Sequence, residues 1–341
     1  MKKVLALILA LCMVLTLFAA CGTDANKGTE DPKTSGDNNT PSDKTYKVGV
    51  ALRIGDMYAA WMKEAFEAKA ADYPNLEVTV FDTQDDAAKN REIIENCIQQ
   101  QFNYLVIQGR LEDFSDLVKQ AQDAGIGCLL INFAPDWCDG VLPVVLCSDY
   151  DLGYVIAQHA AETLPENAKV CILNGNAGVN VFEDRREGFQ KGLLDARPDI
   201  TLLDEQAADC DKAKAMQKTE DWIQTYGDID AILCASDSMA VGAVEAFKSS
   251  GKDLSKVQIY GIDGLTDACQ AIINGEMTAS ALQNAIPYAE KSFELIQKDI
   301  AGEISLAKNE CDAKTLFEAE LIDSSNAQSQ FDLYKEQGLV K

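Results

Sequence analysis

Residues 231–247 read AILCASDSMAVGAVEAF and hold one complete strand-to-helix unit, from which the fold can be inferred. Its first four residues form an apolar run that is typical of a short buried strand. After the polar pair Ser236 and Asp237 comes a longer stretch with helical spacing, residues 238–249. The pattern therefore predicts a buried strand that leads directly into a helix.

The same alternation extends in both directions along the chain, from Tyr46 onward. Strands are expected at residues 47–52, 76–81, 104–107, 128–131, 169–173, 200–203, 231–234 and 257–260. Helices are expected at residues 57–72, 87–101, 152–163, 182–194, 213–225 and 238–249. Alternating βα units favour parallel sheets with helices on both faces. Two consecutive sets predict an α/β fold with two doubly wound, Rossmann-like lobes, joined around residues 141–149, where residues 142–146 read as an extra strand.

The N-terminus has the features of a secretion signal. Lys2 and Lys3 precede a nearly unbroken apolar run of 14 residues, 4–17, which is shorter than the roughly 20 residues that span a membrane. The sequence LFAAC at residues 17–21 resembles the lipobox of bacterial lipoproteins, although Phe18 replaces the usual aliphatic residue. We expect a lipoprotein signal peptide at residues 1–20, a lipid on Cys21 and an extracytoplasmic, membrane-anchored protein. The alternative is an ordinary secretory cleavage that happens to precede a cysteine.

Residues 21–44 lack aromatic residues and have no aliphatic residue larger than alanine and proline. Such a segment cannot bury enough apolar surface to offset its conformational entropy, so we expect a disordered tether.

Charge and cysteine usage exclude several classes of partner. The chain has 55 acidic against 30 basic residues, a balance that repels the phosphates of nucleic acid. Of its 11 cysteines, nine remain after Cys12 and Cys21, and several stand in apolar runs. We interpret these nine as small core residues, with any disulfides left open. The sequence has no CxxC pair and a single histidine, His159, so we expect neither a metal nor a cofactor.

Residues that follow the strands are candidates for ligand contact, because ligands of open α/β sheets bind at the carboxyl ends of the strands. The polar and aromatic residues there are Arg53, Asp56, Tyr58, Trp61, Asn132, Phe133, Arg185, Ser236, Asp237, Asp263 and Gln283.

The chain from about Lys47 to Glu303 resembles the type I periplasmic sugar-binding proteins, the ribose and galactose/glucose group of ABC-transporter receptors. The matching segments are DMYAAWMKEAFEA (56–68), VFEDRREGFQKGL (181–193), AILCASDSMAVGAVEAF (231–247), VQIYGIDG (257–264) and TASALQ (278–283). The resemblance implies that two lobes, joined by a three-crossing hinge, close on a monosaccharide. It places residues 45–148 plus 284–312 in an N-terminal lobe, residues 149–283 plus 313–326 in a C-terminal lobe, and residues 327–341 in a C-terminal tail of unassigned role.

The resemblance also implies a binding site. Its hydroxyl-binding residues would be Asp56, Asn132, Arg185, Asp263 and Gln283, with Tyr58 as a stacking aromatic, Trp61 as its support, and Phe133 and Ser236 nearby. Aromatic rings match the apolar faces of a pyranose, and planar polar groups match its hydroxyls. Each of these residues could instead have a structural role, and these alternatives stay open. They are core packing for Tyr58 and Trp61, helix capping for Asp56 and Asp263, a place on a solvated face for Arg185, and hydrogen bonds to loop backbone for Asn132 and Gln283.

Departures from the family pattern change the expected shape of the site. Cys210 stands where close ribose and glucose receptors place an aromatic ring, Phe133 replaces a basic residue, and Ser236 replaces an asparagine. A standard hexose or ribose is therefore not implied. The calcium loop of the galactose receptors is also missing, since residues 165–168 are too short for it.

The expected function is that of a lipid-anchored solute-binding protein, a monomer that captures a monosaccharide or related polyol and delivers it to the membrane permease of an ABC importer. The alternative is a receptor for a nucleoside or signalling sugar that reports to a membrane sensor or chemoreceptor. GxSxG, HExxH, GxGxxG and GxxxxGK motifs are missing, so we expect no catalytic residues and no enzyme. Repressors of the lactose-repressor kind share the lobed fold, but they begin with a helix-turn-helix where this chain has a secretion signal.

Overall fold

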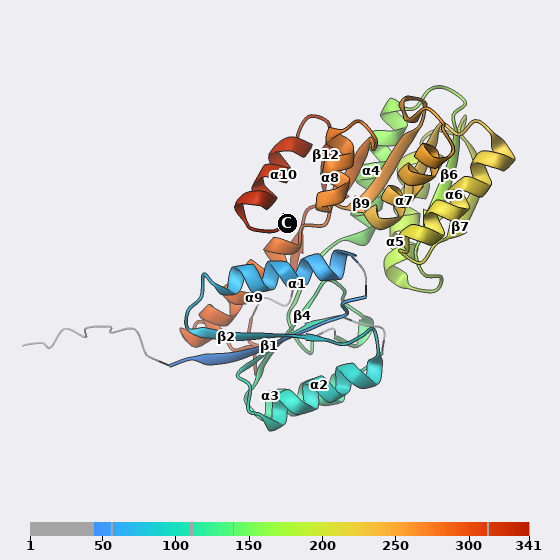
Figure 1. Cartoon of the computed structure of the whole chain (residues 1–341). Helices are drawn as coiled ribbons and strands as arrows, with labels where there is room; N and C mark the ends of the chain where they lie inside the picture. Colours follow the sequence, from blue (N-terminus) through green and yellow to red (C-terminus); the bar gives the residue numbers. More distant parts are fainter. Residues whose placement is uncertain (1–43, 56, 110–111, 139, 312–313, 341) are drawn as a thin grey trace, which may run out of the picture. The chain divides into compact units, whose positions relative to one another are not determined.

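The structure, a computed structural model, describes residues 44–55, 57–109, 112–138, 140–311 and 314–340. These lie in one compact unit, Asp43–Lys341, which holds two six-stranded sheets (Figure 1). The predicted signal peptide, the lipidation site Cys21, the tether up to residue 43 and the candidate ligand residue Asp56 lie outside the described residues.

The first sheet has the strand order β11-β5-β4-β3-β1-β2, and all its pairings are parallel. Its strands are β1 Tyr46–Leu52, β2 Leu76–Asp82, β3 Tyr104–Gln108, β4 Gly127–Ile131, β5 Val144–Cys147 and β11 Lys314–Phe317. Helices α1 Met57–Ala70 and α9 Ala285–Ile300 cover one face, and α2 Ala87–Gln99 and α3 Ser115–Asp123 cover the other (Figure 1). Because side chains alternate along a strand, Val50 and Ala51 of β1 belong to different core clusters, one on each face.

The second sheet has the order β12-β10-β9-β8-β6-β7, in which only the β10–β12 pairing is antiparallel. Its strands are β6 Lys169–Asn174, β7 Thr201–Ala207, β8 Ala231–Cys234, β9 Gln258–Asp263, β10 Ala279–Leu282 and β12 Glu320–Asp323. Its helices are α4 Asp149–Thr163, α5 Asn180–Phe189, α6 Lys212–Tyr226, α7 Asp237–Ser249, α8 Thr266–Ile273 and α10 Ala327–Glu336. The short helical turns of the chain are η1 Asp136–Cys138, η2 Gln190–Leu194 and η3 Leu254–Lys256.

Capping side chains fix where several helices begin. The hydroxyl of Ser148 accepts a hydrogen bond from the backbone N–H of Asp151, so α4 starts directly after β5, at the junction of the two lobes. Asp211 caps α6 in the same way by accepting from the N–H of Lys214.

The chain passes between the sheets three times: between β5 and α4, between β10 and α9, and between β11 and β12. This confirms the two-lobed, doubly wound α/β fold. One boundary differs from the expectation, which placed residues 313–326 in the C-terminal lobe. Lys314–Phe317 instead pairs in parallel with β5 and extends the first sheet. The pairing covers the edge of β5, whose backbone groups would otherwise lack partners.

The nine cysteines among the described residues form no disulfides with one another, and seven of them are buried. Burial raises the pKa of Cys97 and Cys128 to about 12, so both thiols stay neutral. Both properties agree with the interpretation of these residues as small core side chains.

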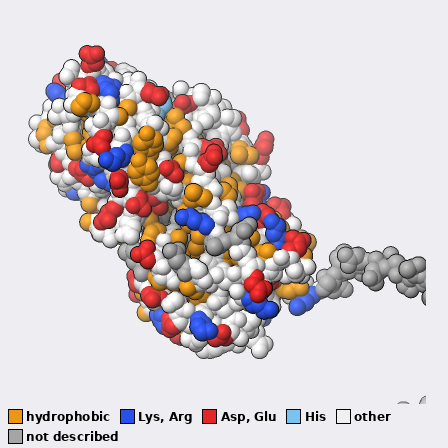
Figure 2. Space-filling view, turned by 180° about the vertical axis from the view of Figure 1, so that it is seen from behind, with side chains coloured by type: hydrophobic (Ala, Val, Ile, Leu, Met, Phe, Trp, Pro, Cys, Tyr) orange, Lys and Arg blue, Asp and Glu red, His pale blue; other side chains and the backbone are white. Residues whose placement is uncertain are grey.

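Figure 2 shows acidic side chains spread over one face of the protein with basic ones among them. No helix in the described ranges combines the length and the hydropathy that crossing a bilayer requires.

Candidate ligand-binding site

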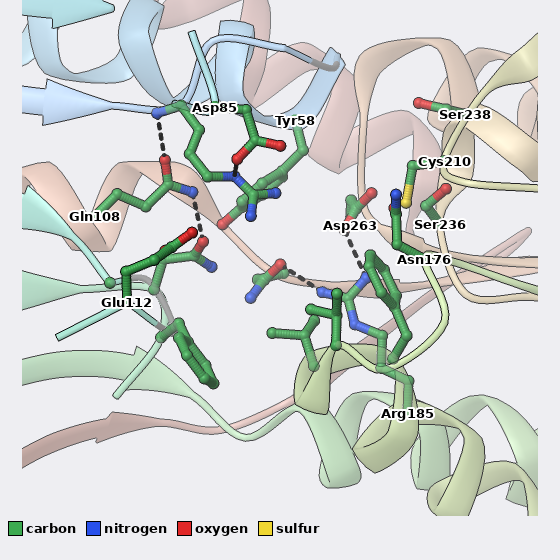
Figure 3. Close-up of a pocket in the computed structure, with 18 residues that line it drawn as sticks. Tyr58, Asp85, Gln108, Glu112, Asn176, Arg185, Cys210, Ser236, Ser238 and Asp263 are labelled. Carbon is green, nitrogen blue, oxygen red and sulfur yellow. Dashed lines mark hydrogen bonds and ion pairs between the residues drawn. The ribbon is translucent and has the colours of Figure 1, made fainter. Parts of the chain in front are cut away.

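A cavity of about 250 Å³ lies at the carboxyl ends of the strands of both sheets (Figure 3). Seven of the nine predicted site residues line it: Tyr58, Asn132, Phe133, Arg185, Ser236, Asp263 and Gln283. Trp61 does not line it, and Asp56 lies outside the described residues. The rule that ligands of open α/β sheets bind at the carboxyl ends of the strands, here called the carboxyl-end rule, thus identified residues that share one cavity although they are more than 200 positions apart in the sequence.

Arg185 of α5 connects several parts of the cavity wall. Only 4% of it is exposed. Its Nε donates to Oδ1 of Asp149 at 2.9 Å, its Nη1 to the carbonyl of Ala235 at 2.7 Å, and its Nη2 to Oε1 of Gln283 at 2.9 Å. Its Nη1 also lies 3.3 Å from Oδ1 of Asp263. Arg185 is therefore a buried side chain with several hydrogen-bond partners, and it is not one charge on a solvated face.

The guanidinium charge of Arg185 is balanced within the wall. Burial disfavours that charge, but the nearby carboxylates of Asp149 and Asp263 outweigh the effect and raise the pKa of Arg185. The N-cap of α8 is Leu265, and the Asp263 carboxylate turns toward Arg185 (Figure 3). The helix-cap alternative for Asp263 is therefore excluded.

Tyr58, in the first turn of α1, supplies a hydroxyl to the same cavity. Its side chain is 8% exposed, and Oη has no hydrogen-bond partner within the part of the chain that the structure describes. Burial is the main cause that raises the pKa of Tyr58 well above its ordinary value, so the phenol stays protonated. A buried, protonated hydroxyl can both donate to and accept from a ligand.

Trp61 lies behind Tyr58. Its ring packs edge-on against Tyr58, with 6.0 Å between the centroids, and against Tyr334, with 5.2 Å. Its position fits the expected support for Tyr58 and gives it no surface on the cavity.

The amide of Asn132 is held by Gln108, a residue that is not among the predicted site residues. Asn132 follows β4 with φ 70°, a left-handed conformation that asparagine tolerates. Its Oδ1 accepts from Nε2 of Gln108 at 2.8 Å, and Oε1 of Gln108 accepts from the backbone N–H of Arg53, also at 2.8 Å. Gln108 is the last residue of β3, so the carboxyl-end rule could have identified it.

Phe182 is a second missed residue, and it provides an aromatic surface from the second lobe. It lines the cavity together with Cys210, and its ring centroid lies 5.8 Å from the guanidinium carbon of Arg185. Gly175 makes room for this ring, because a Cβ at that position would lie 2.3 Å from it. The aromatic surface on this side thus comes from the first turn of α5, while position 210 holds a thiol.

The hydroxyl of Ser236 already hydrogen-bonds to the backbone of α7. It is the N-cap of α7, and its hydroxyl accepts from the N–H of Met239 at 3.4 Å. It nevertheless lines the cavity, as Figure 3 shows.

Among the described residues, neither a metal site nor a histidine belongs to this cavity. Within the described ranges, His, Cys, Asp and Glu side chains form no group of three or more that is suited to a metal ion. His159 of α4 lies elsewhere, with Nε2 3.9 Å from Oδ2 of Asp323.

Comparison with known proteins gives the family context of this site. A family model described as "Periplasmic binding protein domain" matches residues 50–304. The ribose import binding protein of Bacillus subtilis is 29% identical, over 83% of this chain and 88% of that protein. The ribose import binding protein of Haemophilus influenzae is 31% identical, over 73% of this chain and 84% of that protein. The structure of a solute-binding protein from Bacillus halodurans with bound myo-inositol superposes with a TM-score of 0.75. The match covers 86% of this chain and all of that chain at 24% identity, and it shows that the two proteins share a fold.

Proposed function

Since the chain belongs to the family of periplasmic binding proteins, which are solute receptors and not enzymes, we propose that it captures a monosaccharide or related polyol between its two lobes and delivers it to an ABC importer. Relatives named for ribose, xylitol and allose define the range of candidate ligands.

The observation that carries this proposal is the buried hydroxyl of Tyr58, which faces the cavity without a partner among the described residues. Leaving a buried polar group unpaired costs about 1 to 3 kcal/mol, so such groups usually have a partner in the functional state. A ligand hydroxyl would provide one.

The carboxylates beside Arg185 favour a neutral ligand over an anionic one. The guanidinium of Arg185 already contacts two carboxylates, those of Asp149 and Asp263. An anionic ligand would have to compete with them, whereas a sugar hydroxyl can share their hydrogen-bonding atoms.

Aromatic surface supports a ligand with apolar C–H faces. Tyr58 and Phe133 line the cavity from the first lobe, and Phe182 lines it from the second. Rings on both sides match the two faces of a sugar or cyclitol ring.

Hinge closure is the mechanism that this arrangement supports. Arg185 and Asp263 belong to the second lobe, and Tyr58 and Asn132 to the first. A ligand that contacts both groups at once favours the closed state by the free energy of those combined contacts.

Membrane attachment through a lipid on Cys21 completes the proposal and rests on the lipobox-like sequence alone. Expression in bacteria with labelled palmitate tests it: the wild-type chain should carry the label in the membrane fraction, and Cys21→Ala should abolish it. Equal labelling of both proteins would contradict the assignment.

A thermal-shift screen of the purified protein tests the ligand class, with D-ribose, D-allose, xylitol, myo-inositol, adenosine and amino acids as probes. Ligand at about 100 times its Kd stabilises the folded state by about 2.7 kcal/mol, which is easily detected. A rise with a sugar or polyol supports the proposal. A response to adenosine or an amino acid alone would overturn the ligand class.

A further inference from the structure

Tyr334, in the C-terminal helix α10, is completely buried although it lies only seven residues from the end of the chain. Helix α10 packs beside α8 (Figure 1). The Oη of Tyr334 donates a hydrogen bond of 2.8 Å to the carbonyl of Gly264, the residue that follows the cavity residue Asp263. One side chain of the tail therefore reaches the backbone of the candidate ligand site.

The turn at Asp263 and Gly264 needs such support. Asp263 has φ 125° and Gly264 has φ 74°, and the first value is unfavourable for a residue with a side chain. The N–H of Gly264 donates to Oγ of Ser280 at 3.1 Å, and the N–H of Leu265 donates to Oδ2 of Asp237 at 2.8 Å. These bonds fix the N–H side of the turn. On the carbonyl side, Tyr334 provides the short hydrogen bond to Gly264, beside a long contact of 3.9 Å from Sγ of Cys269.

The ring of Tyr334 makes a second connection, toward the first lobe. It packs edge-on against Trp61 of α1, with 5.2 Å between the ring centroids. Trp61 in turn packs edge-on against Tyr58, whose hydroxyl faces the cavity. Leu339, just beyond α10, is also buried and lines a separate cavity with Ala65 of α1.

We infer that Tyr334 is a positioning residue of the ligand site, which holds Asp263 through the carbonyl of Gly264 and holds Tyr58 through Trp61. The C-terminal tail is then part of the binding machinery, because one side chain fixes groups that approach the ligand from both lobes. This inference rests on the proposed function for its effect on binding, but its effect on the turn can be measured without a ligand.

The decisive variant is Tyr334→Phe, which removes the hydrogen bond and keeps the ring. Tyr104→Phe is the matched control: Tyr104 is also buried, and its Oη donates to Oδ2 of Asp299 at 2.7 Å, but it does not line the cavity. Both variants remove one hydrogen bond of a buried tyrosine, so they share the general effect of losing such a bond. An effect on the site should be confined to Tyr334→Phe.

In the ligand-free protein, hydrogen exchange at the backbone amides of Gly264 and Leu265 measures the turn directly. We expect exchange about tenfold faster in Tyr334→Phe than in the wild type and unchanged in Tyr104→Phe. Equal exchange at these amides in all three proteins would overturn the inference, whatever the ligand is.

Binding is measured by calorimetry with D-ribose, D-allose and xylitol as probes, well below the melting temperatures. For a probe that the wild type binds, we expect Kd to rise about fivefold to twentyfold in Tyr334→Phe and to stay within twofold in Tyr104→Phe. Equal Kd values in the two variants would contradict the positioning role. If the wild type binds none of the probes, the proposed ligand class fails and the exchange experiment alone decides on Tyr334.

Discussion

Nη1 of Arg185 lies 3.3 Å from Oδ1 of Asp263, and both side chains are almost completely buried in the cavity wall. The same guanidinium contacts Asp149 through Nε at 2.9 Å. Two carboxylates therefore depend on one arginine, which makes this group structural as well as a candidate for ligand contact.

Replacing Arg185 with alanine should lower the free energy of unfolding by about 3 to 5 kcal/mol, because it leaves two buried carboxylates without a counter-charge. Urea unfolding measures the loss. Arg186→Ala is the control: this neighbour is only partly buried, with Nε 2.8 Å from Oε1 of Glu205, and should cost less than about 1 kcal/mol. Similar losses in the two variants would argue against a special role of Arg185 in stability.

Tyr58→Phe should separate binding from stability. The hydroxyl has no partner among the described residues, so its removal should leave the free energy of unfolding of the ligand-free protein within about 0.5 kcal/mol of the wild type or slightly higher. Sugar affinity should fall about fivefold or more, since one ligand hydrogen bond is lost. Calorimetry and urea unfolding on the same preparations test this, and unchanged affinity would assign Tyr58 to core packing alone.

Phe182→Ala should weaken sugar binding by about 1 to 3 kcal/mol through lost apolar contact. Phe81→Ala provides a control, because Phe81 is also a partly buried phenylalanine but packs in the core of the first lobe, away from the cavity. Calorimetric Kd values for both variants decide the matter. An equal loss in both would point to a general effect of truncating a phenylalanine.

Asp237 should make stability depend on pH. Burial raises the pKa of its carboxyl to about 7, above the value of about 3.9 in the unfolded chain. The folded state then binds more protons between these values, so the contribution of this group is fully present below about pH 4 and is lost as the pH rises through 7. From pH 4 to pH 8, the free energy of unfolding of the wild type should fall by about 2 to 4 kcal/mol relative to Asp237→Asn. A difference that stays constant with pH would refute the raised pKa.

Strands with a continuous, buried apolar run could be predicted closely, whereas β7 Thr201–Ala207 runs four residues past its expected end and β10 and β12 were not expected. Residues 231–234 match β8 Ala231–Cys234, and the expected strand at 47–52 matches β1 Tyr46–Leu52. The strand β11 was harder, since Lys314–Phe317 alternates between exposed and partly buried residues, and only its pairing with β5 assigns it to the first sheet.

The candidate site was predictable where the carboxyl-end rule applies, as it does for Asn132 and Asp263. Phe182 was missed although it stands between β6 and Arg185, so the same rule could have included it. The environment of Tyr334 lies outside this rule. That environment depends on a hydrogen bond across 70 residues of sequence and on a ring contact with α1, and neither leaves a local pattern.

The most direct test of the account is a calorimetric titration of the wild-type protein with a neutral sugar and its phosphate ester, D-ribose and D-ribose 5-phosphate, extended to D-allose, xylitol and myo-inositol. We expect saturable binding of at least one neutral sugar or polyol with one site per chain. D-ribose 5-phosphate should bind more weakly than D-ribose or not at all, because Arg185 is already paired with Asp149 and Asp263. Tighter binding of the phosphate ester, or binding of none of the neutral compounds, would contradict this expectation.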